Sequence, residues 1–454
     1  MAVEKEIIVA IEFGSSKIRC VAGCKNIDGS VQVLDIEQAD ARNCIRKGVV
    51  YNIDKTVLCL KGIIEKVENA LDLQVCKVFV GIGGQSVLTR KNTVSRQFAT
   101  KTVISQELVD SLLKANHNMV YNGYEILEVV PQEYHVGLET TNDPVGVLSN
   151  QIEGTYLNVI ARAELREYVL KCVEACGLEV AGVYVSPLVL ADSVLTDTEK
   201  RSGCALVDFG YGTTTVAVYK NNLLRHLAVI PLGGNNITQD ICTQQVEEEE
   251  AEGLKLKYGS AYADRDDEEL DKNLLVSNGR TIEEHLLVDI VEAREEEILS
   301  NVRVQIRQSG YQNNLMAGIV VSGGASNIRN LDKAISDRVR PEKMRFVRTV
   351  PFTVQAQHAE QLMKDGSQNV LLALLNTGNC PCTAEREKPV AEEPAVAEDL
   401  EPAVRPEAVA EERADTPVEP ITPKTPVEEK KQSTGFGKKI KNWWGKMSDV
   451  FTED

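Results

Sequence analysis

Two stretches far apart in the chain follow the same pattern of residues. The first, EIIVAIEFGSSKIRCVAG at 6–23, and the second, CALVDFGYGTTTVAVYKNN at 204–222, each carry an acidic residue, Phe and Gly after an apolar strand. Small polar residues and a second apolar strand follow in both copies. When Glu12 is laid over Asp208, the flanking strands align as well. This repeat predicts an α/β chain built from two similar halves that face one another.

A hairpin of this kind suits a phosphate group. Backbone N–H groups and hydroxyls donate to phosphate oxygens, and glycine lets the backbone come close. A carboxylate at the strand end can hold a hydrated Mg²⁺ that bridges to the phosphates. Either hairpin alone is more simply a structural turn, whereas two facing hairpins would clamp a triphosphate. The residues expected at the phosphates are Gly14, Ser15, Ser16, Lys17, Gly210, Gly212, Thr213 and Thr214, with Glu12 and Asp208 at the metal.

Two further glycine pairs favour a nucleotide. VIPLGGNNITQDIC places a pair immediately before a helix, whose N-terminus attracts anions. GIVVSGGASNIRNL leads from a buried strand at 318–321 through a second pair into a helix near residue 327, so the backbone can approach ribose or adenine. A single Gly-Gly pair often only ends a strand. The ordered set adds these expected nucleotide-binding residues: Gly233, Gly234, Asn235, Gly323, Gly324 and Ser326.

Composition narrows the functional classes. The formal net charge of −18 disfavours nucleic acid as a partner, because phosphate backbones would repel the chain. The longest apolar runs, such as VLLALL at 370–375, are far shorter than the roughly 20 residues of a membrane span. The N-terminus has acidic residues where a signal peptide is basic, and the 11 cysteines lie mostly in apolar stretches. These features predict a cytosolic chain with free thiols.

The composition changes sharply near the C-terminus. Residues 381–434 are rich in Pro and Glu and contain no aromatic residue, so they cannot bury enough apolar surface to offset the entropy of ordering. We expect this segment to be a disordered, extended linker.

The last stretch, at 435–452, is basic and aromatic. On a helix its apolar residues form one stripe edged by lysines, which describes a helix lying in a membrane interface. A terminal helix packed on the core is the alternative, and the long polar linker disfavours it. The expected membrane-binding residues are Phe436, Lys438, Lys439, Ile440, Trp443, Trp444, Met447 and Phe451.

These motifs resemble those of the actin, Hsp70 and sugar-kinase superfamily. The two hairpins are similar to its phosphate motifs, IVVSGGASNI to its adenosine motif, and VYVSPLVLADSVL at 183–195 to the first helix connecting the halves. Within the superfamily, VFVGIGGQSV at 78–87, PLGGNNITQDI and EEAEGLKLKYGSA at 249–261 resemble segments of the FtsA family of bacterial cell-division proteins.

The resemblance implies duplicated actin-like (ribonuclease H-like) halves that bind ATP and Mg²⁺. It also implies an actin-like filament on the cytoplasmic face of the membrane at the division septum. The implied partners are FtsZ, further copies of the chain, anionic membrane lipids and other division proteins, with no nucleic acid. Hydrolysis stays open, because at most a weak ATPase is expected and no catalytic residue is assigned.

The resemblance also sets the domain boundaries. The implied segments are a first half at 1–84 and 161–200, an inserted FtsA-type subdomain at 85–160, a second half at 201–240 and 303–380, its own inserted unit at 241–302, the linker at 381–434 and the terminal helix at 435–452. By analogy with the family, the unit at 241–302 would meet FtsZ.

Local patterns inside these segments give further expectations. SVLTRKNTVSRQF reads as a pair of strands, and SQELVDSLLKANHN as a helix capped by Ser105. The acidic run at 246–252 reads as an exposed helix face. Glu252 and Lys255 lie where the family reaches adenine or ribose, although their spacing alone favours a solvated i,i+3 ion pair.

Two positions depart from the superfamily pattern, and two other functions compete. Glu12 replaces the usual Asp, which puts the metal geometry in doubt, and Asn369 stands where a small glycine is typical of the second connecting helix. A superfamily small-molecule kinase would need a catalytic Asp in the insert, where Asp110 is the only candidate. A PilM-like pilus-assembly adaptor would lack the long linker and the basic helix.

Overall fold

The computed structural model describes residues 6–263, 273–276, 279–357 and 362–385. The expected terminal helix at 435–452 and most of the expected linker lie outside these residues. The first residues of that expected linker do not fit the prediction. Strand β21 (Thr383–Glu385) pairs with β6 (Leu73–Val75), and Cys382 is buried, so the folded part extends beyond residue 381.

The first half is built on a six-stranded sheet. Its strands, in spatial order, are β12 (Glu179–Val185), β7 (Lys77–Ile82), β1 (Ile8–Phe13), β2 (Lys17–Lys25), β3 (Val31–Asp40) and β20 (Val354–Gln355). Helix α1 (Ile53–Leu71) packs on β2 and β3 and against α3 (Ala163–Glu174), while α11 (Asn369–Thr377) packs on β1 and β2. Because helices cover both faces, β1 is apolar along almost its whole length.

The second half repeats this arrangement. It contributes five strands to a nine-stranded sheet, namely β13 (Cys204–Phe209), β14 (Thr214–Lys220), β15 (Leu223–Ile230), β18 (Gly318–Ser322) and β19 (Met344–Phe346). The order β18-β13-β14-β15 matches β7-β1-β2-β3, with the first pair parallel and the next two antiparallel in both halves. The duplication predicted from the sequence is therefore present in the strand topology.

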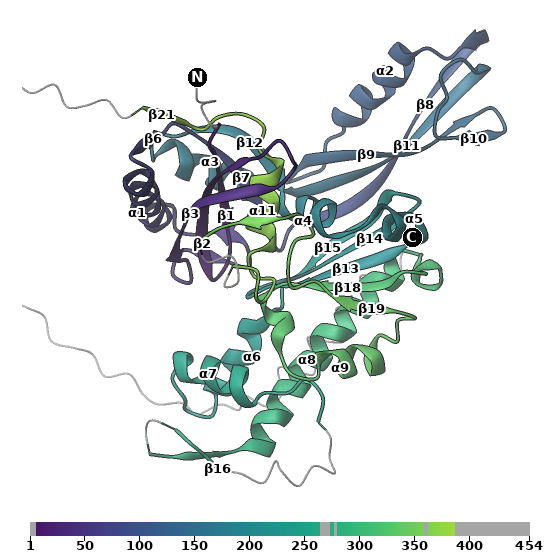
Figure 1. Cartoon of the computed structure of the whole chain (residues 1–454). Coiled ribbons are helices and arrows are strands. Elements are labelled where there is room, and N and C mark those ends of the chain that lie inside the picture. Colours follow the sequence, from purple (N-terminus) through teal and green to yellow (C-terminus); the bar gives the residue numbers. More distant parts are fainter. Residues whose placement is uncertain (1–5, 264–272, 277–278, 358–361, 386–454) are drawn as a thin grey trace, which may run out of the picture. The chain divides into compact units, whose positions relative to one another are not determined.

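Two helices pack against each other between the halves. Helix α4 (Ser186–Val194) lies beside α11, as Figure 1 shows. A Cβ at Gly81 would lie 2.5 Å from Leu374 and 2.8 Å from Ser186, so glycine permits the close approach here. Asn369, the first residue of α11, is buried and donates to the Ser322 hydroxyl at 3.3 Å and the Val347 carbonyl at 3.2 Å. Its amide thus ties the helix to the second half.

The segment between β7 and α3 forms a separate insert of long strands. Its elements are β8 (Leu88–Val103), α2 (Gln106–His117), β9 (Tyr124–Val136), β10 (Glu139–Thr141) and β11 (Leu148–Arg162). The expectation of two strands in SVLTRKNTVSRQF is wrong, because β8 continues through this stretch and pairs with β11 along most of its length. The helix begins after Ser105 as predicted, with the Ser105 hydroxyl accepting from the Leu108 N–H.

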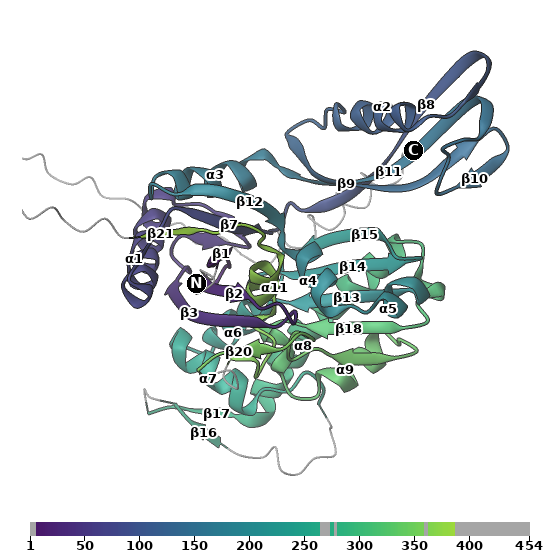
Figure 2. The same ribbon diagram turned by 45° about the horizontal axis from the view of Figure 1, so that its top comes forward.

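The insert touches both halves. The chain enters and leaves it through the first half, yet β8 pairs with β15 of the second half at Leu88 and Ala228. Figure 2 shows the insert strands extending beyond β15, with α2 along them. One sheet therefore runs from the insert into the second half.

The remaining elements complete the second half. Helices α6 (Gly234–Cys242), α7 (Glu248–Tyr258) and α8 (Glu284–Gln308) pack together, and α9 (Leu331–Arg338) packs on α8. The short elements are β4 (Ile45–Arg46), β5 (Val49–Val50), α5 (Asp197–Ser202), β16 (Asn273–Leu275), β17 (Thr281–Glu283), η2 (Gln312–Asn314) and η3 (Gly324–Asn327). The helix expected near residue 327 is thus a short 3₁₀ turn followed by α9. Among the described residues, no helix is both long and apolar enough to cross a membrane.

A buried amide network attaches α2 to the insert strands. Asn116 and Asn158 are fully buried, and Asn116 donates to the Asn158 side-chain carbonyl at 2.6 Å. Asn92 donates to Asn116 at 2.8 Å, and Asn158 donates to the Tyr121 hydroxyl at 2.8 Å. We expect Asn116→Ala to leave buried amide groups unpaired and to lower the local opening free energy of α2 by about 1–3 kcal/mol.

Native-state hydrogen exchange measures this effect. Amides of α2 should lose protection, while amides of β1 in the first half should keep theirs. Lys114→Ala on the exposed side of the same helix is the matched control and should change neither. Unchanged protection of α2 in Asn116→Ala would contradict the role of the network.

Candidate functional site

The two repeated hairpins lie face to face and are closed in the same way. The Gly14 N–H donates to the Lys17 carbonyl at 3.1 Å, and the Gly210 N–H donates to the Thr213 carbonyl at 2.8 Å. A Cβ added at either glycine would lie 2.8 Å from that same carbonyl oxygen. Both turns therefore require glycine at the position after Phe.

The hairpins also touch each other. A Cβ at Gly212 would lie 3.0 Å from the Ser15 hydroxyl oxygen and 3.1 Å from its Cβ. Between and behind the hairpins is a cavity of about 400 Å³. Most of the residues expected at a nucleotide line this cavity, namely Glu12, Gly14, Ser15, Ser16, Lys17, Asp208, Gly210, Gly212, Thr213, Gly234, Glu252, Lys255, Gly323 and Gly324.

Four expected residues do not line the cavity. Thr214 is buried and its hydroxyl donates to the Leu232 carbonyl at 2.9 Å, so the next residue, Thr215, lines the cavity instead. Ser326 is buried and donates to the Gly323 carbonyl at 2.7 Å. Gly233 and Asn235 hold the start of α6 against the second hairpin, where the Asn235 N–H donates to the Tyr211 carbonyl at 2.7 Å.

The sequence patterns missed other residues of the cavity wall. Gly48 has a φ of +76°, and a Cβ there would lie 2.4 Å from the Gly83 carbonyl, so two loops of the first half meet at the wall. The glycine of KGVV, which follows a turn, could have indicated this close approach from the sequence alone. The further lining residues include Arg19, Tyr211, Gly84, Ser186, Pro187, Leu256, Ile328, Asp365, Gly366, Ser367 and Val370.

Two carboxylates face the cavity from opposite halves. Burial raises the pKa of Asp208 to about 7, and the charge of Glu12 adds to this rise. Burial also raises the pKa of Glu12, although Arg19 counteracts the shift through an ion pair of 3.3 Å. Within the described residues, no donor reaches the Asp208 carboxylate. Since Mg²⁺ keeps most of its waters and needs only one or two carboxylates, Asp208 fits a hydrated Mg²⁺.

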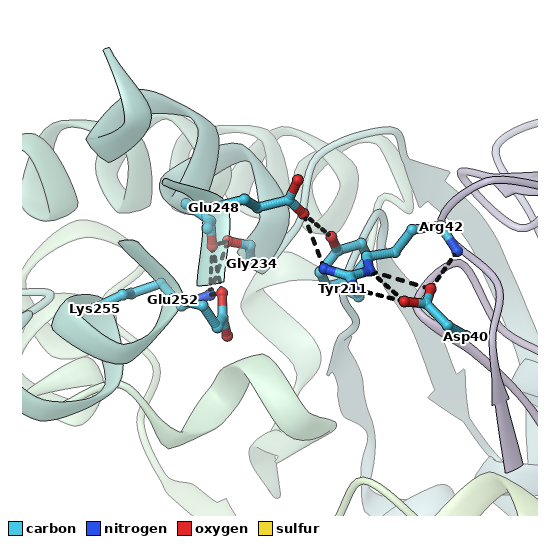
Figure 3. Close-up of polar contacts among 8 residues, drawn as sticks. Asp40, Arg42, Tyr211, Gly234, Glu248, Glu252 and Lys255 are labelled. Carbon is cyan, nitrogen blue, oxygen red and sulfur yellow. Dashed lines mark hydrogen bonds and ion pairs between the residues drawn. The ribbon is translucent and has the colours of Figure 1, made fainter. Parts of the chain in front are cut away.

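Lys255 is buried beside the start of α6, as Figure 3 shows. Its ammonium group donates to the Gly234 carbonyl at 3.1 Å, the Thr238 hydroxyl at 2.9 Å and the Glu252 carboxylate at 2.6 Å. The expected i,i+3 ion pair of Glu252 and Lys255 is therefore present, but its lysine end is not solvated, because only 4% of the Lys255 side chain is exposed against 38% for Glu252. The lysine fixes α7 on the first turn of α6.

A second set of contacts joins the two halves in a pocket beside the cavity. Arg42, after β3, binds Asp40 with distances of 2.5–3.1 Å and lies 3.5 Å from Glu248 of α7. Tyr211, in the second hairpin, donates to the same Glu248 oxygen at 3.1 Å (Figure 3). The expectation that 246–252 is an exposed helix face is therefore only partly right, because Glu248 contacts Arg42 and Tyr211 and Ala251 is buried.

Asp110 is not part of this site. It lies on the exposed side of α2 in the insert, accepts a hydrogen bond of 2.9 Å from Gln106 and does not line the cavity. The catalytic Asp that a kinase would need is therefore not supplied by this residue.

The duplicated halves, the paired connecting helices and the shared cavity define an actin-like fold. A family model described as cell division protein FtsA matches residues 205–366, and one described as the SHS2 domain inserted in FtsA matches 84–160. The chain belongs to the FtsA family.

Curated relatives named cell division protein FtsA support this assignment. The protein of Pseudomonas aeruginosa is 30% identical over 338 residues, which cover 71% of this chain and 78% of that protein. The protein of Porphyromonas gingivalis is 29% identical over 83% of this chain and 79% of its own. Among solved structures, a PilM–PilN type IV pilus biogenesis complex matches with a TM-score of 0.57 and 15% sequence identity. The match covers 81% of this chain and 97% of the chain in that structure, which shows a shared fold.

A buried carboxyl group, whose pKa is raised by burial and lowered in part by the charge of Lys255, should make the folding stability depend on pH. Burial raises the pKa of Glu295 on α8 to about 8, and the nearby Lys255 reduces the shift. The folded protein therefore binds this proton up to a higher pH than the unfolded chain, for which the ordinary pKa is 4.5. Folding stability should consequently fall as the pH rises from about 4.5 to about 8.

Glu295→Gln should remove this contribution. Between acidic pH and about pH 8, the free energy of unfolding should fall in both proteins. The fall should be smaller in the variant by on the order of 1–3 kcal/mol, as measured by urea unfolding. Glu296→Gln, on the exposed side of the same helix, should follow the parent. Parallel pH profiles for the parent and Glu295→Gln would refute the interpretation.

Proposed function

We propose that this chain is an ATP-binding, self-assembling adaptor that tethers the tubulin-like division protein FtsZ to the cytoplasmic face of the bacterial membrane at the septum. The observation that carries the proposal is the contact of the two hairpins at Gly212 and Ser15 around one cavity. Membership of the FtsA family supports the role in cell division.

The nucleotide would lie between the hairpins. Backbone N–H groups and the hydroxyls of Ser15, Ser16 and Thr213 would donate to the phosphate oxygens. Gly323 and Gly324 leave room for the ribose and base on the side of α7 and Lys255. Asp208 would hold Mg²⁺ through water, and when bound this ion supplies positive charge that orients and neutralises the triphosphate.

The terminal stretch at 435–452 would provide the membrane anchor. Its sequence pairs an aromatic and aliphatic stripe with lysines, which suits anionic lipid. One short helix binds reversibly, but several helices carried by one filament bind firmly, because each bound helix raises the effective concentration of the next. Self-assembly and membrane binding would therefore reinforce each other. The acidic body of the chain makes such a basic anchor necessary.

The remaining partners follow from the family. The unit at 241–302 is the surface proposed to meet FtsZ, and other division proteins would join at the same septal location. The kinase alternative is disfavoured, because Asp110, its candidate catalytic residue, does not line the cavity. The fold shared with the PilM complex does not separate a pilus adaptor from a division adaptor, so the terminal stretch carries that distinction.

Gly212 provides a test of the nucleotide site. We expect Gly212→Val to push the hairpins apart and to weaken binding of Mg²⁺-ATP by at least about tenfold, as measured by titration calorimetry. Gly253→Val is the matched control, because Gly253 lies on α7 and a Cβ there meets no atom within 4 Å. Equal affinity in the parent and Gly212→Val would refute this site.

Deletion of residues 435–454 tests the anchor. The shortened chain should no longer sediment with vesicles that contain anionic lipid, yet it should still bind FtsZ. Deletion of residues 405–424 removes an equally long piece of the expected linker and should leave sedimentation unchanged. If the chain lacking 435–454 still sediments like the parent, the stretch is not the anchor.

A further inference from the structure

Arg19 and Glu12 form a charged pair inside the cavity wall. They stand directly opposite each other in the antiparallel ladder of β1 and β2, so their side chains lie on the same face of the sheet. The exposed fractions of the two side chains are 15% and 16%, and both residues line the cavity. The neighbouring residues on β2, Ile18 and Cys20, point to the opposite, fully buried face.

Arg19 uses little of its hydrogen-bonding capacity. A guanidinium group carries five N–H donors in a fixed fork. Within the described residues, the one acceptor that Arg19 reaches is a Glu12 oxygen, at 3.3 Å from Nη1. The Nε atom is buried and has no partner in the protein. Because buried donors without acceptors are costly, the unused fork indicates an acceptor that the protein itself does not supply.

The pairing with Glu12 does not explain the arginine by itself. Charge-assisted N–H···O bonds are usually about 2.7–2.9 Å long, and an arginine that only neutralises a carboxylate commonly binds both oxygens. Here one longer contact is made. The turns of the two hairpins line the same cavity and carry further N–H and hydroxyl donors. An oxyanion is the chemical group that satisfies donors from both turns together with the guanidinium group of Arg19.

We infer that Arg19 contacts a phosphate oxygen of the bound nucleotide, and that Glu12 positions the guanidinium group instead of holding the metal. This inference rests on the proposed nucleotide site. It assigns Arg19 a share of the positive charge that compensates the triphosphate, beside Mg²⁺ and Lys17. ATP binding by this chain should therefore depend less on divalent cation than it would without the charge of Arg19.

Calorimetric titration of the full chain with ATP, in Mg²⁺ and in EDTA, tests the inference. The parent should retain ATP binding in EDTA, and Arg19→Met should bind at least about tenfold more weakly there, with a smaller loss in Mg²⁺. Arg90→Met, at an exposed position on β8, is the matched control and should behave like the parent. Equal ATP affinity of Arg19→Met and the parent in EDTA would overturn the inference.

Titration with adenosine separates failure of the inference from failure of the nucleotide site. Adenosine lacks phosphate, so its affinity should be the same in Arg19→Met and the parent. If the parent binds neither ATP nor adenosine, the proposed function itself fails. If Arg19→Met weakens adenosine as strongly as ATP, the residue supports the wall of the cavity and the phosphate contact is refuted.

Glu12 gives an independent readout. As a positioning residue it brings negative charge near the phosphates, so Glu12→Gln should preserve or raise ATP affinity in EDTA. A metal ligand would instead lose affinity in Mg²⁺ alone, and that result would overturn the assignment. Should Arg19→Met fail to fold because Glu12 is left without a partner, the double variant Glu12→Gln/Arg19→Met removes the pair together, and its EDTA titration decides between the same outcomes.

Discussion

The contact between the two hairpins is the constraint on which the site depends. Gly212 lies so close to Ser15 that a methyl group would already crowd the hydroxyl. The same hairpin carries α6, because the N–H groups of Gly234 and Asn235 donate to the carbonyls of Gly210 and Tyr211. The second hairpin thus holds a helix as well as facing its counterpart. The two halves are joined where their repeated turns meet, and the cavity is the space that these turns leave.

Charge inside the cavity is distributed unevenly between the halves. The first half brings Glu12 together with its own counterion, Arg19, whereas the second half brings Asp208 with no donor near it among the described residues. Lys255 donates to three protein acceptors, and its charge partly offsets the rise that burial causes in the pKa of Glu295. A repeat that is symmetrical in backbone is therefore asymmetrical in electrostatics. The two copies of one motif therefore present different charges to the cavity.

The backbone of the site could be predicted from the sequence, and the side-chain partners could not. The hairpins were predictable because an apolar strand followed by Phe-Gly and small residues is a local signal. Whether Thr214 or Thr215 faces the cavity depends on where β14 begins, since neighbouring strand residues point to opposite faces. The burial of Lys255 depends on α6 and α8, which lie far from it in sequence. The single long β8 was predicted as two strands because the consecutive polar residues Arg90, Lys91 and Asn92 resemble a turn, although the strand continues through them.

The pairing of Leu88 with Ala228 links the insert directly to the sheet of the second half. The insert is covalently attached to the first half, but its strand pairing continues through β15 and β14 to β13, which carries Asp208 next to its last residue. Force applied at the far end of β8 and β11 would be transmitted along their paired strands to this single pair. A neighbour that pulls on the insert would load the same strands that carry the second hairpin, so mechanical tension and cavity shape are linked through one sheet.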